Sequence, residues 1–400
     1  MTRSRPATVN GPLAPYAAGF AEELVGLGYA RRSVETHLYL MSQLSRWLEE
    51  SGLTPGELGS EQMVEFLKAN RATGRRFPRS ADGLKPLLGY LRRVDVAFPL
   101  VAPARTAGEE LVERFGAYLA RERGLAAGTI VGYQHAARLF LASLEARGRE
   151  LGTVSPADLN EFLVAAVPER SVASCKCLVT GLRALLRFLQ AEGVTAVPLA
   201  EAVPAVAGWG GGPLPRGIDA RSVQCLLDSC DRRTSKGRRD FAVLMLLCRL
   251  GMRAGEVTAL ELRDLDWRAG EVVVRGKGPR LERLPLPVDV GEALSGYVRR
   301  SRPRSEHPQV FLRLLAPHTR LTVGAISVIV HAACQRGSLP PVGTHRLRHS
   351  VATELLRQGA GLPEIGQLLR HRSIAVTSIY AKVDTIALHQ LARPWPVIAP

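Results

Sequence analysis

The sequence predicts a mainly α-helical protein with one small antiparallel β-sheet. Apolar residues recur at helical spacing in most segments, a pattern of helix starts and stops occurs twice in the first half of the chain, and β-rich runs are confined to residues 271–287. A length of 400 residues with 46% hydrophobic content is enough to bury sizeable cores and is typical of two or three domains.

An internal repeat organises the first half of the chain. The segments that begin at Ser33 and Thr129 align without a gap at an offset of 96 residues. Each copy starts at a hydroxyl residue that can cap a helix, runs through amphipathic turns, breaks at glycine and restarts behind a second cap, Ser60 or Ser155. The alternative to a true repeat is a generic similarity between helical segments.

The repeat predicts two all-helical domains, over residues 1–104 and 105–193. Each copy adds a further helix, near Ala81–Val94 in the first and near Ser171–Glu192 in the second. Residues 194–217 are dense in proline and glycine and almost uncharged, which favours a linker over a regular element.

Residues 218–400 are expected to form a third domain of mixed character. The segment EVVVRGKGPRLERLPLP at 271–287 holds two short β-rich runs around a Gly-rich turn and predicts a hairpin. Helices are predicted over Asp219–Asp228, Arg239–Arg249, Ala254–Leu260, 345–358, 363–371 and 375–383.

The charge balance indicates a polyanionic partner. A formal net charge of +16 and a pI near 10.2 are typical of proteins that bind nucleic acid. Only six of the 53 basic residues are lysine, so a single arginine is weak evidence of function, whereas Lys277 in the hairpin turn is notable.

Other classes of protein are disfavoured by the sequence. It has no apolar run of about 18 residues and no apolar core at its N-terminus, so we expect neither a membrane span nor a signal peptide. The six cysteines lack the C-x-x-C spacing typical of zinc sites. We therefore expect a reduced, cytoplasmic protein without structural metal. Cys175 and Cys177 are expected to pack on different faces of one helix.

An ordered series of polar residues in the last domain could act on a phosphate. Cleavage of a phosphodiester without a metal needs a nucleophile, cations for the non-bridging oxygens and an acid for the leaving oxygen. Two guanidinium groups can hold those oxygens bidentately. The series consists of Arg253, Lys277, His345, Arg348, His371 and Tyr380.

Each member of the series also has a simpler interpretation. The arginines could be solvated surface charges, Lys277 a turn lysine, His371 a residue at a helix end, and Tyr380 an aromatic at the edge of the core. His345 and His349 have H-x-x-x-H spacing, but the zinc-protease glutamate is missing between them. We expect His349 to pack or to cap.

The order and spacing of the series resemble the tyrosine recombinase family, also called the phage integrase family. The motifs that carry the resemblance are GMRAGEV, THRLRHS, LLRHRS and the T-x-x-Y that ends at Tyr380. The resemblance covers residues 215–383 as the catalytic domain and, loosely, residues 107–193 as the family's core-binding domain. It implies SAM-like helical DNA-binding domains at the N-terminus and a tyrosine recombinase catalytic domain over 218–400.

Carried over to this sequence, the resemblance implies a role for each residue. Tyr380 would attack the scissile phosphate, form a 3′-phosphotyrosyl bond and release a 5′-hydroxyl. Arg253, Arg348 and His371 would stabilise the transition state. His345 would assist proton transfer, Lys277 would be the general acid, and Glu256 would orient an arginine.

The same resemblance implies partners and a biological role. The enzyme would need no cofactor, would act on double-stranded DNA, and would assemble there as a homotetramer or as a mixed tetramer with related recombinases. The helical region before the catalytic domain is longer than chromosome-dimer resolvases need, which favours integration or transposition of a mobile element. The run TIALHQLARPWPVI near the C-terminus could dock on a neighbouring subunit or pack on its own.

The sequence departs from the family pattern at two positions, and two other functions compete with this interpretation. Arg370 occupies a position where the family often has glycine, so it adds a cation and alters a helix end, and Val351 replaces a common aromatic. A type IB topoisomerase uses similar chemistry. A DNA-binding accessory protein of the same fold would bind without cleaving.

Overall fold

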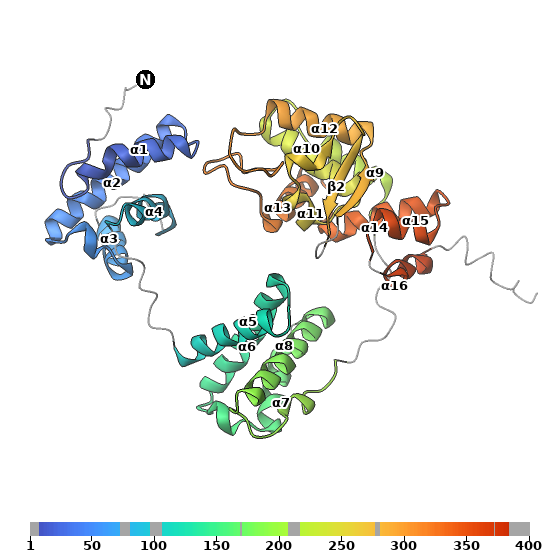
Figure 1. Cartoon of the computed structure of the whole chain (residues 1–400), viewed down its shortest axis with the longest axis horizontal. Coiled ribbons are helices and arrows are strands. Elements are labelled where there is room, and N and C mark those ends of the chain that lie inside the picture. The colour runs from blue at the N-terminus through green and yellow to red at the C-terminus, as the bar shows by residue number, and fades with distance from the viewer. Residues whose placement is uncertain are drawn as a thin grey trace, which may run out of the picture. The chain divides into compact units, whose positions relative to one another are not determined.

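The computed structural model describes residues 8–72, 81–96, 106–168, 170–206, 217–276, 281–371 and 373–383. Residues 99–212 form a compact unit of their own (Figure 1). Buried apolar side chains gather in separate cores, one drawn from residues 9–96, one from residues 111–206, and the rest from the last part of the chain.

The first helical unit lies between residues 8 and 96. Its elements are a 3₁₀ turn η1 (Ala14–Tyr16), α1 (Ala17–Gly26), α2 (Arg31–Ser51), η2 (Pro55–Glu57), α3 (Ser60–Ala72), η3 (Ala81–Leu84) and α4 (Lys85–Arg93).

The second unit repeats this order of elements. It consists of α5 (Ala107–Arg121), α6 (Ala127–Glu145), η4 (Leu151–Thr153), α7 (Pro156–Ala166), α8 (Val172–Ala191) and η5 (Leu199–Glu201). The offset of 96 residues relates the starts of α2 and α6, of η2 and η4, and of α3 and α7. The predicted repeat is therefore confirmed as a structural one.

Each of the two units contains an aromatic pair of similar geometry. Phe20 and Tyr90 in the first unit have ring centroids 5.4 Å apart at 38°, and Phe115 and Phe188 in the second are 5.4 Å apart at 40°. The two pairs do not follow the offset of 96 residues, since Phe115 lies 95 residues after Phe20 and Phe188 lies 98 residues after Tyr90. The repeat therefore rests on the element starts.

The predicted helix caps are only partly right. Ser155 caps α7 as expected, because its hydroxyl accepts from the Asp158 amide while the Asp158 carboxylate accepts from the Ser155 amide. In contrast, Ser60 is the first residue of α3. The first long helix of each copy begins two residues before the predicted Ser33 or Thr129, since an alanine already occupies the N-cap position.

The first part of the segment expected to be a linker is packed against the second core. Leu199 and Val203 are buried in that core, and Arg183 of α8 donates a hydrogen bond of 2.8 Å to the Val203 carbonyl. A proline-rich segment can still bury its few large apolar side chains when a helix offers them a surface, so residues 194–206 extend the second unit. Cys175 is buried and Cys177 exposed on α8, as predicted.

The last part of the chain is the predicted mixed unit. Its elements are α9 (Ala220–Asp228), α10 (Ser235–Arg249), α11 (Ala254–Ala259), η6 (Leu262–Asp264), β1 (Leu265–Asp266), β2 (Glu271–Arg275), β3 (Leu281–Pro285), α12 (Val288–Arg300), α13 (Val323–Arg336), α14 (Thr344–Arg357), α15 (Leu362–Leu368), α16 (Ile374–Thr377) and η7 (Ser378–Val383).

The sheet confirms the predicted hairpin and adds to it. Strands β2 and β3 pair antiparallel, with Val272 opposite Leu284. The two-residue strand β1 pairs with β2 and was not predicted, because a strand of that length has no period to detect. Helices α12 and α13 were also missed. The turn that contains Lys277 lies outside the described residues.

Helix α10 is the central element of this unit. Its residues Ala242–Cys248 are all buried, and α9, α12 and α14 pack around it (Figure 1). It begins at Ser235 and not at the predicted Arg239, because the Thr234 hydroxyl accepts a hydrogen bond of 2.9 Å from the Gly237 amide. This apolar helix fixes the position of the turn at its C-terminal end, where the first candidate site residue follows.

In the part of the chain that the structure describes, no helix is both long enough and apolar enough to cross a membrane.

We expect Gly148→Ala to destabilise the second unit by about 1 kcal/mol, because Gly148 adopts a left-handed φ of 62° that costs an L-residue this much. As a matched control, Gly132→Ala in the middle of α6 should stabilise it by about 0.5–1 kcal/mol, since a Cβ there meets nothing within 4 Å. Calorimetric unfolding of the full chain measures both. A stabilising Gly148→Ala would contradict the assignment.

Candidate active site

Four segments distant in sequence meet in the last unit. They are the turn between α10 and α11, helix α14, the segment after α15, and η7 with Tyr380. Tyr380 packs with Val351, Ile365 and Leu369 in a small apolar cluster beside the larger core. The polar side chains from these segments surround that cluster.

Arg348 ties two of these segments together. One guanidinium nitrogen donates to the carbonyl of Gly251 and another to the carbonyl of Leu369. Gly251 has a left-handed φ of 57°, and a Cβ there would come within 2.6 Å of Leu369. Glycine is therefore required at this crossing for both conformation and space.

Arg348 is only 5% exposed and has other cations near it. Burial lowers its pKa to about 10, with Arg253 and Arg370 adding to the effect. The group stays protonated at neutral pH, but it is held among like charges. Such a cluster favours the binding of an anion.

Glu256 is the buried counter-charge of the cluster. Its carboxylate accepts hydrogen bonds from the Arg253 amide at 2.8 Å, the Arg253 Nη1 at 2.6 Å and the Arg370 Nη2 at 2.8 Å. Burial alone raises the pKa of Glu256, but Arg370 and the bonds from Arg253 outweigh it, so the pKa lies below its ordinary value. The carboxylate thus pairs with two guanidinium groups, and the third, that of Arg348, lies within its electrostatic reach, so positive charge remains in excess.

Arg370, a departure from the family pattern, adds a cation to the cluster and alters a helix end, as expected. Its φ is 56°, a left-handed value that ends α15 earlier than predicted, at Leu368. Its side chain is buried and paired with Glu256, and it also donates to the Leu368 carbonyl at 2.8 Å. The extra cation therefore forms a buried ion pair with Glu256.

His371 lies against the phenol of Tyr380. The two rings are nearly parallel, at 7° with centroids 6.2 Å apart, and the His371 Nδ1 is 2.8 Å from the Thr377 hydroxyl. Burial and the charges of Arg348 and Arg253 lower the pKa of His371 to about 4. The imidazole is therefore neutral at pH 7, with Nδ1 engaged by Thr377.

Tyr380 is 1% exposed, and its hydroxyl lies 2.8 Å from the Nδ1 of His349. The two rings also meet edge to face, with centroids 5.6 Å apart. Burial raises the pKa of Tyr380, while Arg348 and Arg253 oppose that rise. The phenol is protonated at neutral pH and must lose a proton to act as a nucleophile.

The structure brings most of the predicted site residues together. Arg253, Glu256, Arg348, His371 and Tyr380 form one cluster. His345 lies on α14 but is exposed, and Lys277 lies outside the described residues.

Three residues of the cluster were not assigned these contacts from the sequence. The expectation that His349 packs or caps was incomplete, because helical spacing alone could not place the Tyr380 hydroxyl next to it. Arg370 was noted only as a departure from the pattern. Thr377 could have been found from its place in the T-x-x-Y motif.

A hollow of about 540 Å³ opens beside the cluster. Its lining comes from β3, α15 and the segment that follows, and includes Arg283, Gly366, Arg370 and His371. A substrate bound there would meet His371 from the side of the β-hairpin.

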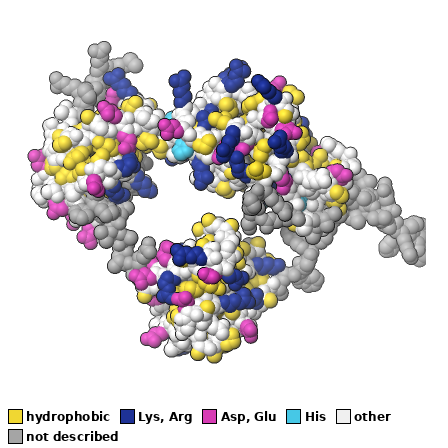
Figure 2. Space-filling model, in the orientation of Figure 1, with side chains coloured by type: hydrophobic (Ala, Val, Ile, Leu, Met, Phe, Trp, Pro, Cys, Tyr) yellow, Lys and Arg dark blue, Asp and Glu magenta, His cyan; other side chains and the backbone are white. Residues whose placement is uncertain are grey.

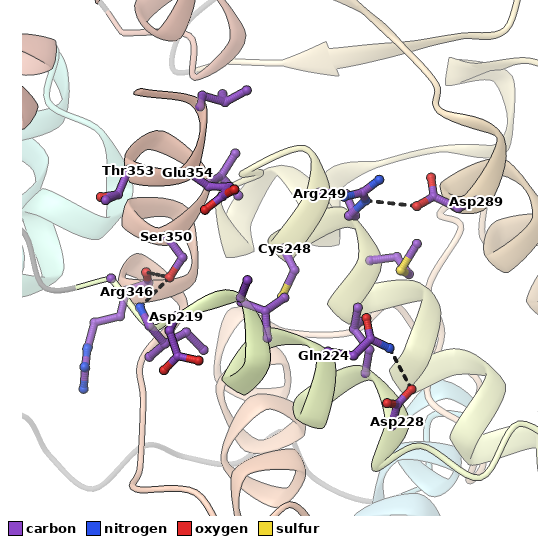
Figure 3. A pocket seen from close by; sticks show the side chains of 18 of the residues that line it. Asp219, Gln224, Asp228, Cys248, Arg249, Asp289, Arg346, Ser350, Thr353 and Glu354 are labelled. Carbon is purple, nitrogen blue, oxygen red and sulfur yellow. Dashed lines mark hydrogen bonds and ion pairs between the residues drawn. The ribbon is translucent and has the colours of Figure 1, made fainter. Parts of the chain in front are cut away.

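A separate cavity of about 920 Å³ lies between α9, α10 and α14 (Figure 3). Figure 3 shows Asp219 and Ser350 at one end of it, and the ion pair of Arg249 with Asp289, 2.9 Å long, at another. Leu227 and Met245 are among the residues that line it. None of the candidate catalytic residues that the structure describes lines this cavity, so it lies apart from the candidate site.

We expect Glu256→Gln to destabilise the last unit by about 3 kcal/mol, because it leaves Arg253 and Arg370 without their buried counter-charge. The exposed pair of Glu271 with Arg283 provides a control, and Glu271→Gln should change stability by less than about 0.5 kcal/mol. Calorimetry of the full chain compares the variants. Equal effects would contradict the proposed role of Glu256.

Acid should destabilise this unit partly through His371. Its pKa in the folded state is about 4, below the ordinary 6.5, so the unfolded chain binds a proton first as the pH falls. The stability that neutral His371 contributes to the folded state is therefore lost as the pH falls from 6.5 to 4. In His371→Gln the melting temperature should therefore fall less over that interval than in the wild type, and identical slopes would contradict the lowered pKa.

Comparisons with known proteins agree with the geometry. Residues 216–386 match the family model described as Phage integrase family, and residues 112–193 match the model described as Phage integrase, N-terminal SAM-like domain. The second match covers the later copy of the internal repeat.

Similar proteins include two kinds of recombinase. The Sinorhizobium fredii protein y4rA, named as an integrase/recombinase, is 38% identical over 393 residues, which cover 96% of this chain and 95% of that protein. The tyrosine recombinase XerD of Mycobacterium tuberculosis is 34% identical over 292 residues, which cover 68% of this chain and 93% of that protein.

Solved structures show the same fold at lower identity. The XerH site-specific recombinase bound to a palindromic difH substrate has a TM-score of 0.57 and 20% identity, covering 71% of this chain and 84% of that one. A lambda integrase dimer bound to a COC′ core site has a TM-score of 0.53 and 18% identity, covering 72% and 98%. The family matches and the near full-length relative show that the chain belongs to the phage integrase family of tyrosine recombinases.

Proposed function

We propose that this tyrosine recombinase cuts and rejoins double-stranded DNA at a specific site, with Tyr380 as the nucleophile that forms a 3′-phosphotyrosyl bond. The observation that carries the proposal is the buried Tyr380 phenol beside an arginine cluster with one carboxylate for three guanidinium groups. A phosphodiester would supply the missing negative charge at the point where the phenol attacks.

The arginines are arranged to hold the phosphate. Arg348 uses two of its five N–H donors on backbone carbonyls, which leaves three for non-bridging oxygens. Glu256 fixes the Arg253 guanidinium so that it need not reorganise in the transition state. His371 would donate from Nε2, and we assign His345 to assist proton transfer.

The released 5′ oxygen needs a proton, and we assign Lys277 as its donor. The phosphotyrosyl ester retains the energy of the broken bond, so a 5′-hydroxyl from another strand can reverse the step without a nucleotide cofactor.

The charge of the chain favours a DNA partner. Residues 218–400 contain 28 of the 53 basic residues but only 16 of the 37 acidic ones, so most of the net charge of +16 belongs to the domain that carries the site. Figure 2 shows Lys and Arg side chains at the surface of that domain among acidic ones. Such a field accelerates encounter with DNA and makes affinity depend on salt.

The proposal also covers the assembly of the protein on DNA and its biological role. Strand exchange requires two duplexes and four active sites, and one solved relative is a lambda integrase tetramer bound to a Holliday junction. We propose a homotetramer or a mixed tetramer on DNA, acting in the cytoplasm on the ends of a mobile element. The helical domains over residues 1–104 and 105–193 would bind DNA together with the catalytic domain over residues 218–400.

The test of this function is covalent trapping. A nicked duplex carrying the DNA that flanks the gene should give a denaturant-resistant protein–DNA complex, which Tyr380→Phe abolishes because the nucleophilic oxygen is missing. Tyr297→Phe is the matched control, since Tyr297 is a buried tyrosine of the same unit whose hydroxyl accepts from the Leu312 amide. It should retain the complex.

Three outcomes would contradict the proposal. A complex that survives Tyr380→Phe would place the nucleophile elsewhere. Binding to a verified site without any complex would favour an accessory protein. Relaxation of arbitrary supercoiled plasmid without recombinant product would favour a topoisomerase.

We further expect Arg348→Lys to slow cleavage by about 10²–10³-fold, because lysine cannot hold two backbone carbonyls and a phosphate in one planar fork. Arg357→Lys, at an exposed position of the same helix, should leave the rate unchanged. Single-turnover cleavage of the nicked duplex measures both rates. Equal rates for the two variants would rule out the role of Arg348.

A further inference from the structure

We propose that His349 is the catalytic base that takes the phenolic proton of Tyr380. This inference rests on the proposed function of Tyr380 as nucleophile. It concerns a residue that was expected only to pack or to cap.

The contact between the two side chains is direct. The Nδ1 of His349 lies 2.8 Å from the Tyr380 hydroxyl oxygen, and the rings meet edge to face at 61°. His349 follows Arg348 in α14, so the same helix carries a cation for the phosphate and a partner for the nucleophile. A candidate base must lie within hydrogen-bond reach of the proton that it removes, and His349 does.

The proposal requires one direction for this hydrogen bond. The Tyr380 O–H group donates to the lone pair of the His349 Nδ1, 2.8 Å away, and the imidazole proton resides on Nε2.

His349 is in the protonation state that a base needs. Burial lowers its pKa below the ordinary value, and the charges of His345 and Arg348 on the same helix lower it further. His371, which follows α15, also faces it. The ring is neutral at pH 7, and a bound phosphate would offset these positive charges, so the basicity of His349 rises when substrate is present.

The other two histidines are less suited to the role. The Nδ1 of His371 is engaged by the Thr377 hydroxyl, and its ring stacks on the phenol without a hydrogen bond to it. His345 is exposed one turn away on α14. His349 alone among the described histidines has a hydrogen bond to the phenol.

The step balances as a proton transfer coupled to transesterification. The O–H proton of Tyr380 moves to the His349 Nδ1 as the bond from the phenol oxygen to phosphorus forms. The bond from phosphorus to the 5′ oxygen breaks, and that oxygen receives a proton from the general acid, assigned to Lys277. In the rejoining step His349 returns the proton to the departing phenol.

Substitution separates a base from a group that only positions the phenol. His349→Gln keeps a hydrogen-bond acceptor but cannot take a proton, so single-turnover cleavage of the nicked duplex should slow by about 10²-fold or more. His345→Gln should slow it less. A greater loss of cleavage rate in His345→Gln than in His349→Gln would overturn the proposal. A His349→Gln variant that cleaves faster than the wild type would also overturn it, because the hydrogen bond would then only restrain the phenol.

Chemical rescue and pH dependence give a sharper readout. Added imidazole should restore cleavage in His349→Ala but not in Tyr380→Phe. The wild-type rate should fall as acid protonates His349 below the ordinary histidine range, and His349→Gln should lose this limb of the profile. Absence of rescue together with an unchanged profile would assign His349 a structural role and overturn the proposal.

A measurement without DNA separates this inference from the function on which it rests. Nitrogen NMR of the histidine-labelled full chain, assigned with His349→Gln, should show Nδ1 unprotonated and Nε2 protonated. A proton on Nδ1 would overturn the proposal even if cleavage occurs. If the wild type forms no covalent complex while this tautomer is observed, the proposed function fails and the hydrogen-bond assignment stands.

Discussion

The site depends first on the carboxylate of Glu256. It binds Arg253 from two directions and Arg370 from a third, and so joins the end of α10 to the end of α15. Three guanidinium groups could not share this space without a negative partner, because unpaired buried charge costs several kcal/mol. Glu256 makes the cluster stable, yet it leaves the excess of positive charge that a phosphate can satisfy.

The backbone carries the second constraint. Arg348 reaches the carbonyls of Gly251 and Leu369, while Gly251 and Arg370 both adopt left-handed conformations. These two turns bring the arginines to the edge of the small apolar cluster in which Tyr380 is buried. The left-handed Arg370 costs about 1 kcal/mol where glycine would cost nothing, and its ion pair with Glu256 offsets this cost.

The two helical units show how one packing solution can be used twice. The same offset relates the helix starts and the 3₁₀ turns, while the surface charges of the copies differ. Core residues must fill the same volume in both units, whereas exposed residues are free to change with the partner. The later copy lies within the segment that matches the SAM-like family model.

Much of this protein followed from the sequence by itself. Periodicity, glycine breaks and the repeat at 96 residues determined the helical units and the hairpin, because those signals are local in the chain. The order of Arg253, Arg348, His371 and Tyr380 indicated the chemistry. Weak local signals explain the misses: β1 has two residues, and the start of α10 depends on the Thr234 side chain.

Only the tertiary structure decided which side chains meet. His349 reaches a hydroxyl 31 residues away, and Arg370 reaches a carboxylate 114 residues away. Spacing along α14 fixes the face on which His349 lies, but not what packs against that face. Long-range contacts between turns and helix ends have no period in the sequence, so the partner of the Tyr380 phenol could be found only in the folded chain.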